Sequence, residues 1–335
     1  MRKGKMLIGA ISLACLLLLY LPVYQLTHTY RTLQQIHKPA LSVKETPRIA
    51  LISPAIRDLY FKEVELGVQE VAKKQGITVE LHGGYRGNAL EMARVIQKVT
   101  SAKVDGIIVV GIDDPTFIQA VNQATESGIP VILIGTDIPS SLRKMYVGSD
   151  HIAAGRILGE KVRVDLGKKS NPTVGIIGQS TDQMVAMLRI KGAEQGLASQ
   201  KSMQVVKQIY DSSERNGMMQ TMSQTHELLN RTSNLDAIIV SKGEELEAVI
   251  RVIEQRVGLG KIQIYTFQDV ASLTDLFAKG QVQAVVVDNP RKMGEESIKY
   301  LLSWIRGERL PLPSHVYTDS TLQTSTGSRF RNEEH

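Results

Sequence analysis

The sequence has almost no cysteine and few aromatic residues. Only one of its 335 residues is a cysteine, Cys15, so the chain cannot form an internal disulfide and its folded part depends on a hydrophobic core. Aromatic residues make up 5% of the chain. The two adjacent aromatics in ISPAIRDLYF, Tyr60 and Phe61, are therefore unusual, and they stand where a strand should end and a helix begin. The length predicts two domains of ordinary size.

The sequence also lacks the motifs of common catalytic and metal sites. Its seven histidines are scattered, and no serine stands in a G-x-S-x-G elbow. The stretch HGGYRGN, residues 82–88, has neither the lysine of a phosphate loop nor the spacing of a dinucleotide fingerprint, which favours a turn. Asp113 and Asp114 could ligate a metal, but an acidic residue before Pro115 is also a common helix start, and this interpretation is favoured. We therefore expect no enzyme, no metal and no cofactor.

Positive charge is concentrated at the N-terminus. The formal net charge is +6, and residues 1–47 hold six lysines or arginines and one acidic residue, Glu45. The remaining chain is therefore almost neutral, and it does not have the basic balance typical of nucleic-acid binding.

An apolar run from Met6 to about Tyr24 follows the first three cations. About 20 apolar residues in a helix can cross a bilayer, whereas a cleavable signal peptide has a shorter apolar core and a cleavage site, which we do not find. The positive-inside rule places the N-terminus in the cytoplasm. We predict a single-pass membrane anchor over residues 1–24, a polar stalk over 25–47 and an extracytoplasmic domain. Lipid attachment at Cys15 is an alternative, but the apolar run continues past it.

From residue 48 onward, short β-branched runs alternate with amphipathic stretches. RIALIS (48–53), GIIVV (106–110) and IPVILI (129–134) are typical of buried parallel strands. Helical patterns follow RIALIS over 59–74 and GIIVV over about 115–126, and another spans about 89–101 after ITVEL (77–81). The same cycle restarts after residue 150. This predicts an α/β fold of two Rossmann-like lobes with parallel sheets, joined by a hinge of several segments, with the ligand at the carboxyl ends of the strands.

The predicted boundaries follow from the same pattern. We predict an N-terminal lobe over residues 48–149 and a C-terminal lobe over 150–266, and we expect the chain to recross between the lobes near 267–269 and 288–290. Residues 291–318 are predicted to form a final helix and strand that pack back on the N-terminal lobe. Residues 319–335 are predicted to be a disordered tail.

The strand and helix segments also carry a family resemblance. They include RIALISPAIRDLYFKEVELGVQEVAKKQGITVEL, KVDGIIVVGIDDP, SGIPVILIGTDIP and QAVVVDNPRKMGEESIKYLLSWIRGE. The chain from about Arg48 to Pro311 resembles the type I periplasmic sugar-binding proteins of the ribose/galactose-binding group, whose core is shared with the ligand domain of Lac-repressor-type regulators. The resemblance implies a sugar bound between two lobes that close over it. A repressor is not expected, because a membrane run replaces the DNA-binding domain.

The resemblance also implies the roles of individual residues. Tyr60 and Phe61 correspond to the aromatic pair that sandwiches the sugar, and Arg189 to an arginine that reaches the ring oxygens. Together with polar residues at the strand ends, the predicted ligand-binding set is Asp58, Tyr60, Phe61, Asp137, Ser149, Arg189, Lys242, Gln268 and Asp288.

Four positions depart from the family pattern. Gly135, Lys242 and Gln268 stand where relatives usually have Asp, Asn and Asp, and Asp288 stands near a usual Gln. The loss of two carboxylates and the gain of a lysine beside Arg189 shift the expected site toward positive charge. They favour an acidic, phosphorylated or otherwise modified sugar as a hypothesis.

Two partners are compatible with this interpretation. A solute-binding protein would deliver its ligand to the permease of an ABC-type sugar transporter. A membrane-tethered co-receptor would signal through its closed form to a sensor histidine kinase, and the uncleaved anchor slightly favours this alternative. Transport remains the first expectation.

Overall fold

The computed structural model describes residues 46–84, 88–179, 184–200, 202–210, 217–258, 260–267, 273–325, 327 and 330–331. The predicted anchor, most of the stalk, Cys15 and Gln268 lie outside these residues. In the part of the chain that is described, no helix has both the length and the apolar character needed to cross a bilayer.

The N-terminal lobe is a parallel α/β unit. Its strands are β1 (Arg48–Ser53), β2 (Thr78–Gly83), β3 (Gly106–Val110), β4 (Val131–Ile134), β5 (Met145–Ser149) and β11 (His315–Thr318). Its helices are α2 (Leu59–Gln75), α3 (Ala89–Ser101), α4 (Pro115–Glu126) and α10 (Pro290–Ile305). The sheet order is β11-β5-β4-β3-β1-β2, and every pair is parallel.

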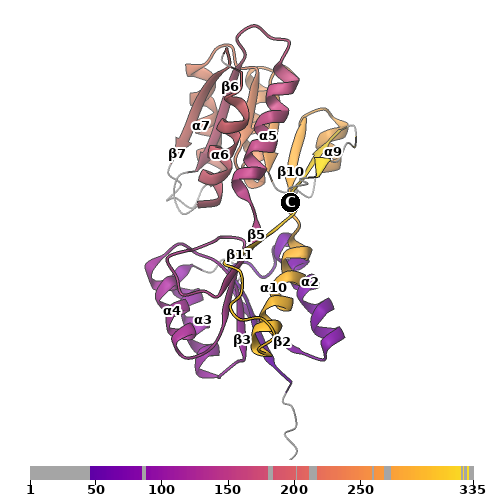
Figure 1. Ribbon diagram of the computed structural model, residues 1–335. Coiled ribbons are helices and arrows are strands. Elements are labelled where there is room, and N and C mark those ends of the chain that lie inside the picture. The colour runs from indigo at the N-terminus through magenta and orange to yellow at the C-terminus, as the bar shows by residue number, and fades with distance from the viewer. Residues whose placement is uncertain are drawn as a thin grey trace, which may run out of the picture. The chain divides into compact units, whose positions relative to one another are not determined.

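The C-terminal lobe repeats this design with an antiparallel extension. Its strands are β6 (Thr173–Gln179), β7 (Gln204–Tyr210), β8 (Ala237–Val240), β9 (Gln263–Phe267), β10 (Ala284–Val287), β12 (Thr321–Thr324) and β13 (Phe330–Arg331). Its helices are α5 (His151–Leu166), α6 (Met184–Leu197), α7 (Gly217–Arg231), the 3-10 turn η1 (Gly243–Glu245), α8 (Leu246–Arg256) and α9 (Leu273–Ala278). The order is β13-β12-β10-β9-β8-β6-β7, in which β12 and β13 run antiparallel to their neighbours. Helices α5, α6 and α7 of this lobe, with strands β6 and β7, are labelled in Figure 1.

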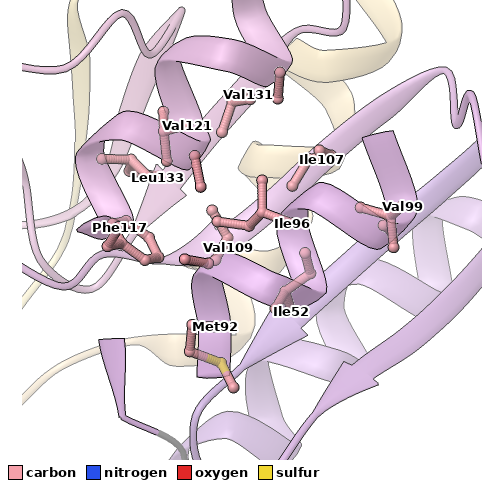
Figure 2. Close-up of a cluster of buried hydrophobic side chains, with 14 of the residues drawn as sticks. Ile52, Met92, Ile96, Val99, Ile107, Val109, Phe117, Val121, Val131 and Leu133 are labelled. Carbon is pink, nitrogen blue, oxygen red and sulfur yellow. The ribbon is translucent and has the colours of Figure 1, made fainter. Parts of the chain in front are cut away.

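Each sheet is buried on both faces, as its continuous apolar strands predict. Alternate residues of β1 show this: Ala50 and Ile52 pack with α3 and α4, while Ile49 and Leu51 pack with α2 and α10. Figure 2 shows the first of these cores, in which Phe117 of α4 packs among side chains of α3, β3 and β4. The strand ends are therefore held rigidly, and side chains that follow them are placed by the core.

Two helices of the C-terminal lobe, α5 and α6, approach each other at backbone distance. A Cβ atom at Gly192 of α6 would lie 2.0 Å from the carbonyl oxygen of Ile152, and one at Gly155 of α5 would lie 2.2 Å from the carbonyl oxygen of Arg189. Only glycine permits this approach. The contact fixes the position of α6, and with it the side chain of Arg189.

Within the described residues the chain passes between the lobes at three places, two of which were predicted. The passages at Ser149–Asp150 and 288–290 join β5 to α5 and β10 to α10. The predicted passage near 267–269 falls partly on residues outside the described part of the chain; β9, which ends at Phe267, and β10 are parallel neighbours in one sheet. The third lies at 319–320, where the chain leaves β11 and enters β12. The predicted disordered tail is therefore wrong at Thr321–Thr324, whose backbone pairs with β10.

Candidate functional site

A pocket of about 160 Å³ opens at the carboxyl ends of β1, β3 and β4. It is lined by Ser53, Pro54, Ala55, Asp58, Tyr60, Phe61, Val64, Val110, Ile134, Gly135 and Met293. Most of these groups are apolar, and they come from the N-terminal lobe and the first turn of α10. The pocket therefore lies at the edge where an open parallel sheet binds its ligands.

Six residues of the motif ISPAIRDLYF line this pocket, among them Asp58, Tyr60 and Phe61. Asp58 caps α2, since its carboxylate accepts a hydrogen bond of 2.7 Å from the backbone N–H of Tyr60. The Tyr60 ring is half-buried, and its hydroxyl lies 3.8 Å from the sulfur of Met293. Phe61 is buried in the core between α2 and α10, with 3% of its surface exposed. Tyr60 is thus the more accessible aromatic of the predicted pair, and it packs against the core cluster to which Phe61 belongs.

Arg189 and Asp288 form a buried ion pair. A guanidinium nitrogen of Arg189 lies 2.9 Å from Oδ2 of Asp288, and the two side chains are 5% and 4% exposed. Burial is the largest single cause and would raise the pKa of Asp288, but Arg189, His151 and the hydroxyls of Ser149 and Ser320 together lower it. The guanidinium also stacks on the Phe267 ring, 5.0 Å from its centroid. The aspartate is therefore ionised and serves as the counter-ion of the arginine.

The three interlobe passages meet at this ion pair. Ser320, from the third passage, donates a hydrogen bond of 3.1 Å to Oδ1 of Asp288 in the second. The hydroxyl of Ser149, from the first passage, also lowers the pKa of Asp288. Sequence reasoning predicted Ser149 and Asp288 but missed Ser320, because it placed that residue in a tail. The three passages thus share one polar cluster.

Gly135 adds a backbone acceptor beside this cluster. Its φ of +73° turns its carbonyl so that the hydroxyl of Tyr146 donates to it at 3.0 Å and Nε2 of His151 lies 3.1 Å away. Burial and the nearby Arg189 charge lower the pKa of His151, which favours the neutral ring with Nε2 as donor. Tyr146 and His151 were not predicted, and their only sequence signal is their place around the end of β5.

The C-terminal lobe contributes a second group of polar residues. Lys242 stands just after β8. Burial is the main cause that lowers its pKa, and the charges of Glu244 and Glu245 act in the opposite direction and raise it. Glu245 is 3% exposed, and burial raises its pKa to about 7. The hydroxyl of Tyr210 donates to this carboxyl at 3.2 Å. Of these groups, the prediction named Lys242 alone.

Asp137 differs from the other predicted site residues because its carboxylate is already occupied. Two nitrogens of Arg143 contact both of its oxygens, one of them at 2.8 Å. Arg143 also donates to the carbonyl oxygen of Ser314 at 3.0 Å. Asp137 therefore ties the loop after β4 to the segment before β11, and a ligand would have to compete with Arg143 for it.

The ion pair also weakens the argument for an acidic ligand. That hypothesis depended on excess positive charge from Arg189 and Lys242, but Asp288 neutralises the first of these cations. Lys242 in turn is close enough to Glu244 and Glu245 to be influenced by them. The sequence alone could not reveal this pairing, since Arg189 and Asp288 are 99 positions apart.

A known family, described as periplasmic binding protein domain, matches residues 49–309. The chain belongs to this family. Its type I fold, with two α/β lobes, is the one that the sequence predicted.

Several relatives of this periplasmic binding protein cover most of its length. The ABC transporter periplasmic-binding protein YphF of Escherichia coli is 25% identical over 272 residues, which are 77% of this chain and 82% of YphF. The ribose import binding protein RbsB of Salmonella typhimurium is 22% identical over 78% of this chain and 86% of its own. The solved structure of GanP, a glucose-galactose binding protein from Geobacillus stearothermophilus, superposes with a TM-score of 0.76 at 27% identity, over 84% of this chain and 98% of GanP.

Proposed function

We propose that this chain is a membrane-anchored, extracytoplasmic solute-binding protein that binds a sugar or sugar derivative for an ABC-type transporter. The observation that carries the proposal is the pocket at the carboxyl ends of β1, β3 and β4, where Tyr60 offers an aromatic face beside hydrogen-bonding groups. The aliphatic face of a sugar ring stacks on such an aromatic, and its hydroxyls need donors and acceptors around the rim. The names of GanP and RbsB support the same ligand class.

The two lobes would contribute different contacts. The ring would rest on Tyr60, which Phe61 and Met293 support, while hydroxyl groups reach Arg189 and Asp288. A ligand that contacts both lobes stabilises the closed arrangement by its difference in affinity for the two states. The passages at 149–150, 288–290 and 319–320 are the segments that would bend.

Thermal unfolding with a panel of sugars tests this function. A sugar present at about 100 times its dissociation constant should add about 2.7 kcal/mol to the free energy of unfolding. Tyr60→Ala should abolish this ligand-dependent gain. Tyr300→Ala is the matched control, because Tyr300 is also partly buried against the same core but does not line the pocket.

One outcome of the Tyr60→Ala measurement would contradict the stacking role of Tyr60. If the variant keeps the full ligand-dependent gain, the ring does not stack on Tyr60. A double substitution with Phe61→Ala would be less informative, because Phe61 belongs to the core and its truncation costs about 3–5 kcal/mol by itself.

A second candidate function is a ligand-sensing co-receptor for a membrane histidine kinase. The apolar run from Met6 to about Tyr24 favours it, since an anchored binding protein stays beside one membrane partner. Cross-linking in native membranes, with and without the sugar that binds, separates the two roles. Ligand-dependent recovery of a permease supports transport, whereas recovery of a sensor kinase supports the co-receptor.

A further inference from the structure

The carboxylate of Asp288 controls the charge that a ligand meets at Arg189. The two side chains are almost fully removed from solvent, so water and salt screen their charges weakly. Ser320 donates to the second oxygen of the carboxylate and holds it in place. The guanidinium is therefore neutralised before any ligand arrives.

Arg189 nevertheless keeps hydrogen-bonding capacity. Among the residues that the structure describes, its Nε atom is buried and has no hydrogen-bond partner. A buried donor without a partner is costly, and a ligand oxygen would relieve this cost. Because the charge of Arg189 is already balanced, a neutral hydroxyl or ring oxygen suffices as acceptor.

The influence of Asp288 extends to the aromatic shelf. Burial raises the pKa of the Tyr60 hydroxyl, and the next largest cause is the charge of Asp288. A ring that rests on Tyr60 is therefore within the field of this carboxylate. The charge of Lys242 is influenced by Glu244 and Glu245, and Asp58 adds a carboxylate to the pocket lining.

We infer that Asp288 is a specificity-determining residue that, as the fixed counter-ion of Arg189, selects against anionic ligands. A carboxylated or phosphorylated ring would either displace Asp288 and leave a buried carboxylate without its partner, or lie beside it and be repelled. This inference rests on the proposed function, because it concerns the ligand of the same site. It replaces the acidic-ligand hypothesis that the sequence favoured.

Calorimetric titration with matched sugar pairs tests this assignment. The pairs are D-galactose and D-galacturonate, D-glucose and D-glucuronate, and D-ribose and D-ribose 5-phosphate, added to the full chain in a detergent without a sugar headgroup. In any pair that binds, the neutral member should bind at least about tenfold more tightly, because like charges brought together are repelled strongly. Asp288→Asn, which keeps the shape and removes the charge, should reduce this ratio by about tenfold.

Asp165→Asn is the matched control. Asp165 is also a partly buried, ion-paired aspartate of the C-terminal lobe, and it contacts Lys161 at 2.5 Å and the hydroxyl of Tyr265 at 2.7 Å. It lies near the far end of α5, so this variant should keep the wild-type ratio. If Asp288 had only a structural role, Asp288→Asn would weaken the binding of both sugars of a pair equally, and the ratio of their affinities would not change.

Two outcomes overturn the inference and leave the proposed function standing. One is an anionic sugar that binds the wild type as tightly as its neutral partner, and the other is an unchanged ratio in Asp288→Asn. Asp288→Ser provides a second uncharged variant if Asp288→Asn does not fold. Failure of every sugar to bind the folded wild type is a separate result, which contradicts the proposed function and this inference with it.

Discussion

The two lobes are built alike but present opposite chemistry at the carboxyl ends of their strands. The N-terminal lobe offers a mostly apolar pocket whose one charged group, Asp58, is a helix cap. The C-terminal lobe buries Arg189 and Glu245 and half-buries Lys242 at the equivalent edge. The first edge has a single charged residue among those that line its pocket, whereas the second holds several charges that influence one another. The difference suggests that one lobe recognises the shape of a ring and the other its charge and hydroxyl groups.

The largest expected effect comes from breaking the buried ion pair. Arg189→Ala leaves the carboxylate of Asp288 buried without its partner and should lower the free energy of unfolding by about 3–5 kcal/mol. The comparable variant of the N-terminal lobe is Arg143→Ala, which should cost less because the partner carboxylate of Asp137 is 28% exposed and can be hydrated. Urea unfolding of both variants measures the difference. Equal losses would mean that the two ion pairs contribute equally and that burial does not distinguish the two lobes.

The second effect is a pH dependence located in the C-terminal lobe. Burial raises the pKa of Glu245 from 4.5 to about 7, so the folded state favours the protonated carboxyl. The contribution of Glu245 to stability therefore falls as the pH rises from about 4.5 through 7. Glu245→Gln, which resembles the protonated form, should be more stable than the wild type by about 3 kcal/mol at pH 8 and nearly equal to it at pH 4.5.

Unfolding curves at both pH values check this prediction. Glu247→Gln is the control, since Glu247 lies on α8 nearby but its side chain is 67% exposed and pairs with Arg251 on the surface. A Glu245→Gln variant whose advantage does not change with pH would show that its carboxyl is not held in the protonated form.

The smallest effect concerns the cap in the N-terminal pocket. Asp58→Ala removes the side-chain acceptor for the N–H of Tyr60 and should cost about 1 kcal/mol, whereas Asp58→Ser keeps a capping oxygen and should cost less. Urea unfolding of the two variants Asp58→Ala and Asp58→Ser measures how much the capping hydrogen bond contributes to stability. A loss of several kcal/mol in Asp58→Ala would mean that this lobe also depends on a polar network, which would remove the contrast between the lobes.

The fold was largely predictable from the sequence because each strand and helix has a strong local pattern. The helices predicted over 59–74 and 89–101 are observed as Leu59–Gln75 and Ala89–Ser101. The third passage was missed because TDSTLQT is short and polar, and only its pairing with β10 makes it a strand. Its partner strand lies more than 30 positions away, so no local pattern indicates the contact.

The site was less predictable, for a related reason. Residues at strand ends could be selected from the sequence. Among those selected, Arg189 and Asp288 are close enough to Tyr60 for their charges to influence its pKa. The ion pair between Arg189 and Asp288 could not be predicted, because only tertiary contacts bring a charged residue to its counter-ion. The same limit explains Asp137, whose partner Arg143 was not identified as such.

The meeting of all three interlobe passages at Asp288 has a consequence for any protein that binds this chain. Ser149, Asp288 and Ser320 belong both to the segments that would bend and to the surroundings of Arg189. Affinity for the ligand and the arrangement of the lobes are then thermodynamically linked. A partner that prefers one arrangement must change the ligand affinity by the same factor by which the ligand changes the affinity for the partner. A permease that favours the open arrangement would thereby promote release, and a receptor that favours the closed one would make the ligand bind more tightly.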